Sequence, residues 1–334
     1  MKPVFALLAI LLVAGMPVLV VAQSLRPLEV NVFAGGANWP LFVAQEKGLF
    51  AANGLAVKVT STPNSVELIR GLMNGTFDIA MTTFDNVVAY QEGQGEVTLP
   101  SSPDLFAFMG GINSALRLIV NPEIKAYADL KGKTLGVDAV NTGYALGMYK
   151  LLAVHGLVPG DYQLARTGGT IFRVQALMQG KIDGTVVNSP LEIVPEAKGY
   201  RRLGDFLESF GAYQAISGAT RRSWAASNED RLLAYIRSFV AAVDWLYDPA
   251  NRPEAIAIYQ KFVPETPGEI ADKAWLVMLS GKEGFQRKAK LDLQGANTVV
   301  RIRSEFGTPR KALEDAAKYF DESYYERALA GVVK

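Results

Sequence analysis

Short apolar segments of strand length alternate along the chain with longer segments whose apolar residues recur at helical spacing. In the stretch GVDAVNTGYALGMY, which spans residues 136–149, an apolar run ends in a small polar loop and a helix-like segment follows at once. The start of a helix carries unpaired N–H groups and partial positive charge. The loop can therefore either cap the helix or hold a ligand, and the remaining pattern has to distinguish these interpretations.

Part of this pattern occurs twice. The stretches LMNGTFDIA and LMQGKIDGT begin at residues 72 and 177, and they share Leu, Met, Gly and Asp at a separation of 105 positions. In each stretch a helix is predicted to end at a glycine, Gly75 or Gly180, in the left-handed conformation that favours glycine. An aspartate follows three residues later in both copies and precedes an apolar strand.

The segments upstream of these stretches match as well. Residues 28–38 (LEVNVFAGGAN) and 131–141 (KGKTLGVDAVN) both read as a strand that enters a loop containing asparagine. Helix-like segments follow, and they end in Gly-Leu at 54–55 and 156–157. The chain thus contains two copies of strand–loop–helix–strand–helix–strand, which predicts an α/β protein with parallel-rich sheets. The alternative is that a common type of helix ending occurs twice by chance.

The repeat also predicts where a ligand binds. Ligands of parallel α/β sheets bind beyond the carboxyl ends of the strands. Four such loops are predicted at 34–39, 82–86, 138–144 and 187–192. Two lobes that face each other would bring all four loops to one cleft.

The order of these segments predicts how the chain is divided. We expect a leader at 1–22, the first part of lobe 1 at 23–114, lobe 2 at 115–210, and a return to lobe 1 followed by C-terminal helices at 211–334. Two segments that cross between the lobes would form a hinge. The pair Gly110-Gly111 and the single Gly218 are candidates for flexibility in these segments.

The leader has the layout of a secretory signal peptide. Lys2 precedes an apolar run, and the small residues Val20 and Ala22 allow cleavage after Ala22. The alternative is an uncleaved membrane anchor, because the run approaches spanning length. No comparable apolar run occurs later in the sequence.

Composition excludes several kinds of site. The chain has no cysteine, which removes disulfides, thiolate metal sites, a cysteine nucleophile and a lipid-attachment site. The single histidine, His155, argues against multi-histidine metal sites and a Ser-His triad. Without Lys2, 33 basic residues balance 33 acidic residues, which gives no support to nucleic-acid binding. We expect no metal and no cofactor.

Together these segments resemble a known family. The stretches NWPLFVAQEKGLFAANGLAVKV, LIRGLMNGTFDIAMTTFDNV, ADLKGKTLGV and ALMQGKIDGTVVNSPLE are similar to the solute-binding proteins of ABC importers, in the branch that includes sulfonate, taurine, nitrate and thiamine-precursor binders. The resemblance covers about residues 28–245 and implies a two-lobed, type II periplasmic-binding-protein fold with Venus-flytrap closure. It implies a periplasmic, monomeric, non-enzymatic protein that delivers a small-molecule solute to a permease in the inner membrane.

Candidate solute contacts lie in the four loops and at the crossing point. They are Asn38, Trp39, Thr82, Thr83, Phe84, Asp85, Asn113, Asp138, Asn141, Thr142, Gly143, Asn188 and Ser189. Asn141, Thr142 and Gly143 are the strongest candidates, because a helix start can hold a carboxylate, sulfonate or carbonyl oxygen. Trp39 could stack on the solute or belong to the core. Asp85 could cap a helix or pair with a cation.

The loops also limit the solute. They contain no Arg or Lys, and the nearest basic residues are Arg117 and Arg173. A doubly charged anion normally requires such a partner, so we expect a small organic solute that is neutral or singly anionic. Two other functions remain open, namely an enzyme on the same fold (of the dehydratase or menaquinone-pathway kind) and a solute sensor for a receptor kinase.

Overall fold

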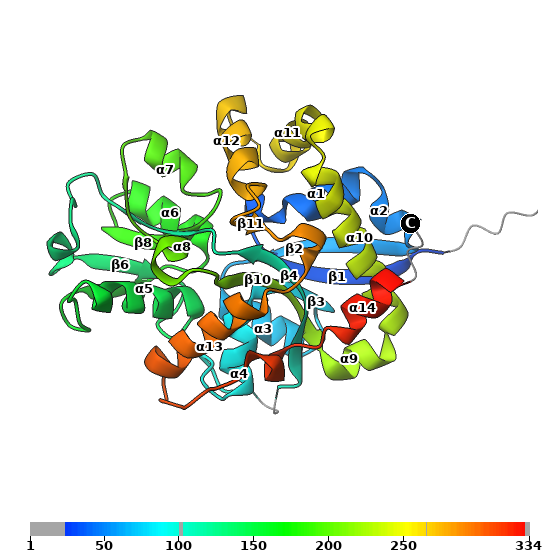
Figure 1. Cartoon of the computed structure of the whole chain (residues 1–334), viewed down its shortest axis with the longest axis horizontal. Helices are drawn as coiled ribbons and strands as arrows, with labels where there is room; N and C mark the ends of the chain where they lie inside the picture. The colour runs from blue at the N-terminus through cyan, green and yellow to red at the C-terminus, as the bar shows by residue number, and fades with distance from the viewer. Residues whose placement is uncertain (1–23, 100–102, 265, 331–334) are drawn as a thin grey trace, which may run out of the picture.

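The computed structural model describes residues 24–99, 103–264 and 266–330, and these form two lobes (Figure 1). The predicted signal peptide and its cleavage site at Ala22 lie outside the described residues. None of the helices in the described part of the chain is long and apolar enough to cross a membrane.

The first lobe is built on a six-stranded sheet with the order β11-β4-β10-β3-β1-β2. Its strands are β1 (Arg26–Phe33), β2 (Leu55–Thr62), β3 (Ile79–Thr83), β4 (Leu105–Asn113), β10 (Gln214–Arg221) and β11 (Gly284–Phe285). The helices from the N-terminal part are α1 (Trp39–Glu46), α2 (Leu49–Ala52), α3 (Ser65–Met73) and α4 (Phe84–Gln91).

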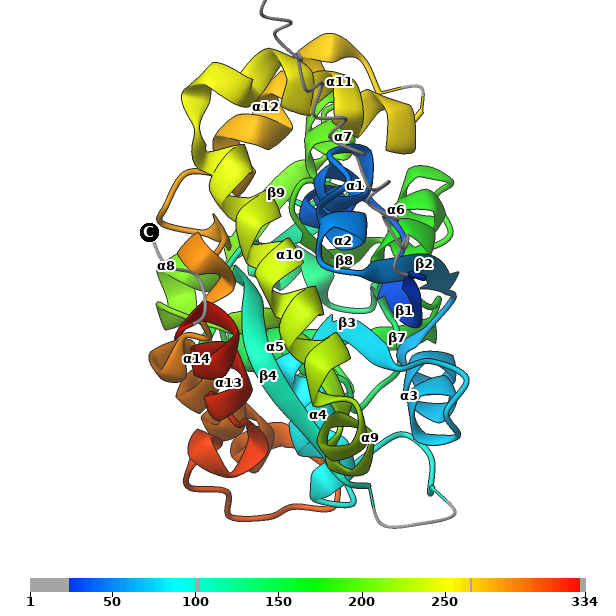
Figure 2. The same cartoon turned by 90° about the vertical axis from the view of Figure 1, so that its right-hand side faces the viewer.

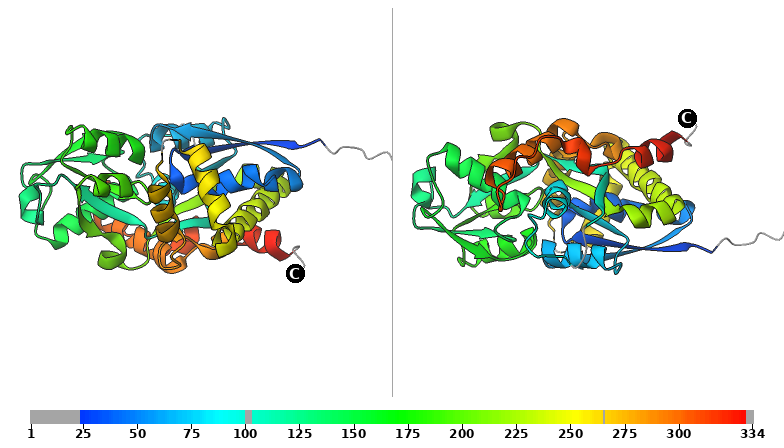
Figure 3. Two further views of the ribbon diagram at one scale, coloured as in Figure 1. Left: turned by 90° about the horizontal axis from the view of Figure 1, so that it is seen from above. Right: turned by 90° about the horizontal axis from the view of Figure 1, so that it is seen from below.

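The C-terminal part of the chain returns to this lobe, as expected, and is mostly helical. It contains α9 (Arg222–Ser227), α10 (Glu229–Tyr247), α11 (Arg252–Phe262), α12 (Gly268–Met278), α13 (Leu293–Phe306) and α14 (Ser323–Ala330). Figure 2 shows α10 lying across the sheet beside α1 and α14, and both neighbours contact it. Helix α13 contacts β10 of the first lobe and α5 of the second, so it lies across the junction between them (Figure 3).

The second lobe is built on a five-stranded sheet with the order β7-β6-β8-β5-β9. Its strands are β5 (Leu116–Val120), β6 (Thr134–Val137), β7 (Gln163–Arg166), β8 (Gly184–Asn188) and β9 (Arg201–Asp205). Its helices are α5 (Gly143–Val154), α6 (Thr170–Met178), α7 (Ile193–Ala197) and α8 (Phe206–Phe210). Sheet membership changes between Asn113 and Leu116 and again between Asp205 and Gln214, and we propose lobe boundaries near residues 114 and 210 on this basis.

Both sheets are mixed, where the sequence pattern had predicted parallel-rich sheets. Strand β1 pairs in parallel with β2 and β3, and β6 pairs in parallel with β7 and β8. The strands that carry the chain between lobes or finish a sheet, which are β4, β5, β9, β10 and β11, pair antiparallel with their neighbours. Strand β10 runs opposite to both β3 and β4, and β5 runs opposite to both β8 and β9, so each sheet contains an antiparallel strand next to a crossing segment.

The repeated aspartate has the same role in each lobe. Asp78 Oδ2 accepts a hydrogen bond from the Glu29 N–H at 2.9 Å, and Asp183 Oδ2 accepts one from the Thr134 N–H at 2.8 Å. The backbone bond from each aspartate N–H to the carbonyl oxygen of the same partner completes the pair, at 2.9 and 2.7 Å. Each aspartate therefore joins the first strand of its copy to the strand that follows the repeated helix.

The two crossing segments are hydrogen-bonded to each other. The Ser114 N–H donates to the Tyr213 carbonyl at 2.8 Å, and the Tyr213 N–H donates to Asn113 Oδ1 at 3.0 Å. The glycines predicted to be flexible instead lie inside strands. A Cβ added at Gly110 would come within 2.6 Å of the Lys290 carbonyl, and one added at Gly218 within 2.7 Å of Phe108. These glycines allow close packing, so we place the hinge at the segments that contain Asn113, Ser114 and Tyr213.

The role of Asp183 can be tested by measuring stability. We expect Asp183→Ala to lower the free energy of unfolding by about 1–3 kcal/mol, because the Thr134 N–H loses its acceptor in a partly buried position. Asp183→Asn keeps one acceptor oxygen, and we expect a loss of less than half that size. Urea denaturation of both variants is the measurement. Equal losses in the two variants would contradict this role for the carboxylate.

Candidate functional site

A cavity lies between the two lobes. The first lobe lines it with Phe33, Ala34, Ala37, Asn38, Leu41, Met81, Thr83, Asn86, Gly111, Ile112, Ile216, Phe239 and Phe285, and the second with Asp138, Thr142, Gly143, Tyr144, Thr170, Arg173 and Asn188. Its volume, counted as the space open to the centres of water molecules, is about 50 Å³. A single water requires roughly 10–15 Å³ by that measure, so the cavity can hold a small organic molecule.

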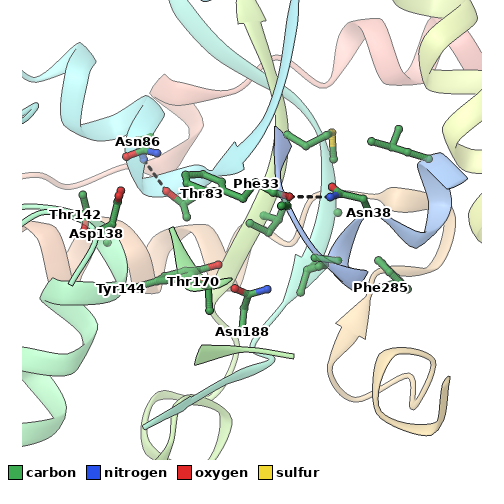
Figure 4. Close-up of a pocket in the computed structure, with 18 of the residues that line it drawn as sticks. Phe33, Asn38, Thr83, Asn86, Asp138, Thr142, Tyr144, Thr170, Asn188 and Phe285 are labelled. Atoms are coloured by element: carbon green, nitrogen blue, oxygen red, sulfur yellow. Dashed lines mark hydrogen bonds between the residues drawn. The ribbon is translucent and has the colours of Figure 1, made fainter. Parts of the chain in front are cut away.

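The two walls of the cavity differ in chemistry (Figure 4). The first lobe contributes most of the apolar side chains, among them Phe239. Two others, Phe33 and Phe285, are labelled in Figure 4. The second lobe contributes mainly polar groups, including the carboxylate of Asp138 and the hydroxyl of Tyr144. A molecule in the cavity would therefore face an apolar wall on one side and hydrogen-bonding groups on the other.

Asp138 lies where strand β6 gives way to the loop before α5, and it reaches across to the first lobe. Its Oδ2 accepts a hydrogen bond from the Ser65 N–H at 3.1 Å, at the start of α3. The positive end of that helix favours a carboxylate in this position. Its Oδ1 is buried and has no hydrogen-bond partner among the described residues.

Tyr144 and Arg173 form the deeper part of the polar wall. The Tyr144 hydroxyl is buried, also without a partner in the described part of the chain, and burial raises the pKa of this hydroxyl well above its usual value. Arg173 donates to Thr185 Oγ1, the Gly168 carbonyl, Thr170 Oγ1 and the Val186 carbonyl, at 2.7–3.0 Å. Burial lowers the pKa of its guanidinium, and the charge of Asp138 opposes that change. Most of its N–H groups thus hold the second lobe together.

Six of the predicted solute contacts line the cavity. They are Asn38, Thr83, Asp138, Thr142, Gly143 and Asn188. They come from all four predicted loops, so the structure brings the four loops to one place. Asn38 donates its amide N–H groups to the Phe33 and Gly35 carbonyls at 2.7 and 3.1 Å, and the Thr142 hydroxyl donates to the Ala139 carbonyl at 2.9 Å.

Three other predicted residues lie within the first lobe, outside the cavity lining. Trp39 is fully buried against Tyr259 and Trp275, and its Nε1 donates to the Ala255 carbonyl at 3.0 Å. Phe84 is also fully buried, and its ring lies edge-on to that of Tyr319. Thr82 accepts a hydrogen bond from the Asn86 amide at 2.9 Å.

Asp85 and Asn141 join the lobes at one edge of the cleft. The Arg303 guanidinium binds both carboxylate oxygens of Asp85 at 2.6 Å and also donates to the Asn141 carbonyl at 2.7 Å. The Asn141 side chain donates to the Gln94 and Thr308 carbonyls at 2.6 Å and accepts from the Thr308 N–H at 3.0 Å. The Asn141 amide, predicted to hold the solute, is thus bonded to the first lobe.

Asn113 and Ser189 lie near the crossing point. Asn113 donates to Asp292 Oδ2 at 2.6 Å, and the Ser189 hydroxyl donates to Glu192 Oε1 at 2.6 Å. Neither residue lines the cavity. His155 directly follows the last residue of α5, and its ring stacks on that of Tyr127 with 3.6 Å between the ring centroids.

Sequence reasoning missed several lining residues, some of which carried a local signal. Tyr144 belongs to the predicted loop 138–144, but its position inside a helix concealed it. Thr170 starts α6 after Gly168 and Gly169, in a fifth strand-end loop of the kind that the repeat predicts. Phe239 and Phe285 come from α10 and β11, where the local pattern indicates only a core position.

Comparison with known proteins gives the family. A sequence model described as NMT1/THI5 like matches residues 37–252. The chain is 24% identical over 226 residues to a 4-amino-5-hydroxymethyl-2-methylpyrimidine phosphate synthase of Schizosaccharomyces pombe, a match that covers 64% of this chain and 63% of the synthase. The chain thus spans less than two thirds of that relative. It is also 24% identical over 237 residues to the putative binding protein YtlA of Bacillus subtilis, covering 69% of each.

Solved structures show the same fold. The periplasmic nitrate-binding protein NrtA of Synechocystis PCC 6803 superposes with a TM-score of 0.75 at 15% identity, covering 93% of this chain and 90% of that one. At this identity the similarity shows the architecture alone, namely the two-lobed periplasmic-binding-protein fold. Because the family match extends over well more than half of the sequence, the chain belongs to the NMT1/THI5-like family.

Proposed function

We propose that this protein is the periplasmic solute-binding component of an ABC-type importer. It captures a small organic solute, neutral or singly anionic, and delivers it to a permease in the inner membrane. The observation that carries this proposal is the cavity between the lobes, which has an apolar wall on the first lobe and hydrogen-bonding groups on the second. We assign solute contacts to the six predicted residues in its lining, Asn38, Thr83, Asp138, Thr142, Gly143 and Asn188.

Two sets of contacts between the lobes would stabilise the closed form. At one edge, Asp85 and Arg303 form an ion pair that is at most 1% exposed, and Arg303 also binds the Asn141 carbonyl of the second lobe. Glu96 accepts from the Asn141 N–H and pairs with Arg166 of the second lobe. A solute that touches both walls favours the closed form, because it binds that form better than an open one.

At a second edge, the loop before α3 meets the loop before α6. The Gly169 N–H donates to the Pro63 carbonyl at 2.9 Å, and the Ser65 N–H donates to Asp138. A Cβ added at Gly168 would come within 2.9 Å of the same carbonyl, so a glycine permits this close approach. If the lobes open to release the solute, both sets of contacts have to separate.

An enzyme on the same fold is the second candidate, because one relative is a pyrimidine phosphate synthase. The described cavity lining includes no imidazole and no thiol, and Asp138 is its one carboxylate. Asp138 could act as a general base only if its free oxygen met a proton of the substrate. Solute binding requires no such proton transfer, and the contacts between the lobes would stabilise the closed form around the solute.

The test is to purify residues 23–334 from cells, denature the protein, and identify released compounds by mass spectrometry. A compound that is recovered unchanged and binds again in calorimetry would support the proposal. At 100 times its dissociation constant it should stabilise the protein by about 2.7 kcal/mol. Conversion of the compound by the protein would favour the enzyme. If no compound is recovered and none of a solute panel binds, the proposal fails.

The buried ion pair generates a prediction about stability. We expect Arg303→Ala to lower the free energy of unfolding by about 3–5 kcal/mol, because it leaves the Asp85 carboxylate buried without its partner. The double variant Asp85→Leu with Arg303→Met should recover most of this loss. The matched control is Arg301→Ala, because Arg301 is exposed on the same helix. A loss in the control as large as that in Arg303→Ala would contradict the prediction.

Asn141 generates a prediction about kinetics. Its amide binds the first lobe, so Asn141→Ala should weaken the closed form without removing a contact to the solute. We expect solute dissociation to accelerate about tenfold, which corresponds to about 1.4 kcal/mol, with an unchanged association rate. Stopped-flow fluorescence with the identified solute is the measurement, and Asn74→Ala, on an exposed turn, is the control. An unchanged dissociation rate would show that these bonds do not hold closure.

A further inference from the structure

The two oxygens of Asp138 are in different situations. Oδ2 accepts the Ser65 N–H of the opposite lobe at 3.1 Å. Oδ1 is buried, no described residue donates a hydrogen bond to it, and Asp138 lines the cavity. A buried carboxylate oxygen without a donor costs free energy that a bound group can recover. In Figure 4 the Asp138 side chain lies beside Thr142 and opposite Asn86 and Thr83 of the first lobe.

The asparagines of the lining add further acceptors. Asn38 donates its amide N–H groups to the Phe33 and Gly35 carbonyls, Asn86 donates to Thr82, and Asn188 donates to the Ser189 carbonyl. No donor within the described ranges bonds to the side-chain oxygen of any of these three residues. An amide whose nitrogen is bonded within the protein presents its oxygen as an acceptor.

Fixed donors are scarce in the same lining. Arg173 is the one guanidinium or ammonium group among the described lining residues, and four of its five N–H bonds go to its own lobe. The Thr142 hydroxyl donates to Ala139. The hydroxyls of Thr83, Thr170 and Tyr144 can rotate to donate or accept. Asn86 and Asn188 each keep a second amide N–H, and Arg173 keeps one N–H, whereas Asp138 Oδ1 is the charged acceptor of the described lining that has no donor.

Carboxylates already lie near the positive ends of two nearby helices, α3 and α5, although no side chain caps the start of α5 or of α6. Asp138 lies at the start of α3 through its bond to Ser65. Glu96 accepts from the Asn141 N–H in the loop before α5. An oxyanion placed in the cavity would be repelled by the Asp138 carboxylate, and Arg173, the one cation of the described lining, keeps only one of its five N–H groups free to bind it.

We propose that the solute presents N–H donors, as a neutral amide or a protonated amidine or amine does, to Asp138 Oδ1, and that oxyanions are disfavoured. This inference rests on the proposed function of solute binding. The proposed solute is therefore neutral or protonated, and the singly anionic compounds allowed above are disfavoured. A donor bound to Oδ1 also fixes the carboxylate that holds Ser65, so Asp138 couples recognition of the solute to closure of the lobes.

The test uses four probes with one ring and different head groups: benzamidinium, benzamide, benzoate and benzenesulfonate. Calorimetry gives their affinities for the wild-type protein and for Asp138→Asn, which keeps one acceptor oxygen for the Ser65 N–H. We expect benzamidinium and benzamide to bind the wild-type protein at least tenfold more tightly than the two anions. In Asp138→Asn, benzoate should gain at least tenfold relative to benzamidinium.

The control is Asp161→Asn, because Asp161 also accepts a backbone N–H but lies on an exposed turn of the second lobe. It should keep the wild-type order. Tighter wild-type binding of benzoate or benzenesulfonate would overturn the inference and leave solute binding intact. Binding of no probe would also overturn it, and the compound extracted from cells would then decide separately about the proposed function. If Asp138→Asn does not fold, the order of the four probe affinities for the wild-type protein decides the inference alone.

Discussion

The ion pair of Asp85 and Arg303 is the contact on which the shape of the cleft depends. It joins α4 to α13 within the first lobe, and the same guanidinium extends to the Asn141 carbonyl of the second lobe. Both charged groups are buried, so breaking the pair inside the protein would leave each charge with a large desolvation cost that nothing offsets. The loop before α5 is therefore held at a fixed place relative to the first lobe, and the polar wall of the cavity is placed with it.

The residues of the cleft fall into two groups: those that bind the opposite lobe and those that line the cavity. Asn141 and Asp85 bind protein groups, whereas Thr142 and Gly143, the next residues along the chain, line the cavity. Asp138 belongs to both groups, since one oxygen binds the opposite lobe and the other is free. The walls also differ, because an apolar surface contributes burial of the solute while the polar groups select among solutes by their donors.

The sequence predicted those features that arise from local and repeated patterns. The helix ends at Gly75 and Gly180, where φ is 82° and 67°, and the strands that follow were all visible in the repeat. The meeting of the four loops followed from the general behaviour of α/β sheets. Pairings between distant segments could not be predicted this way, because Arg303 lies 218 positions after Asp85 and nothing near Asp85 indicates that partner. For the same reason the sequence could not predict that Phe239 and Phe285 line the cavity. It also could not decide between the two interpretations of Trp39, whose partners are distant along the chain.

The strand order of the first sheet has a consequence for how the molecule assembles. Strand β10 lies between β3 and β4, although it follows β4 by about a hundred residues along the chain. All strands of the second lobe fall within residues 116–205, so that lobe is a continuous segment able to form from local pairings. The first sheet instead receives its strand β10 from a segment that follows the whole second lobe. A chain that ends before β10 therefore lacks an inner strand of this sheet, together with Ile216 of the cavity lining.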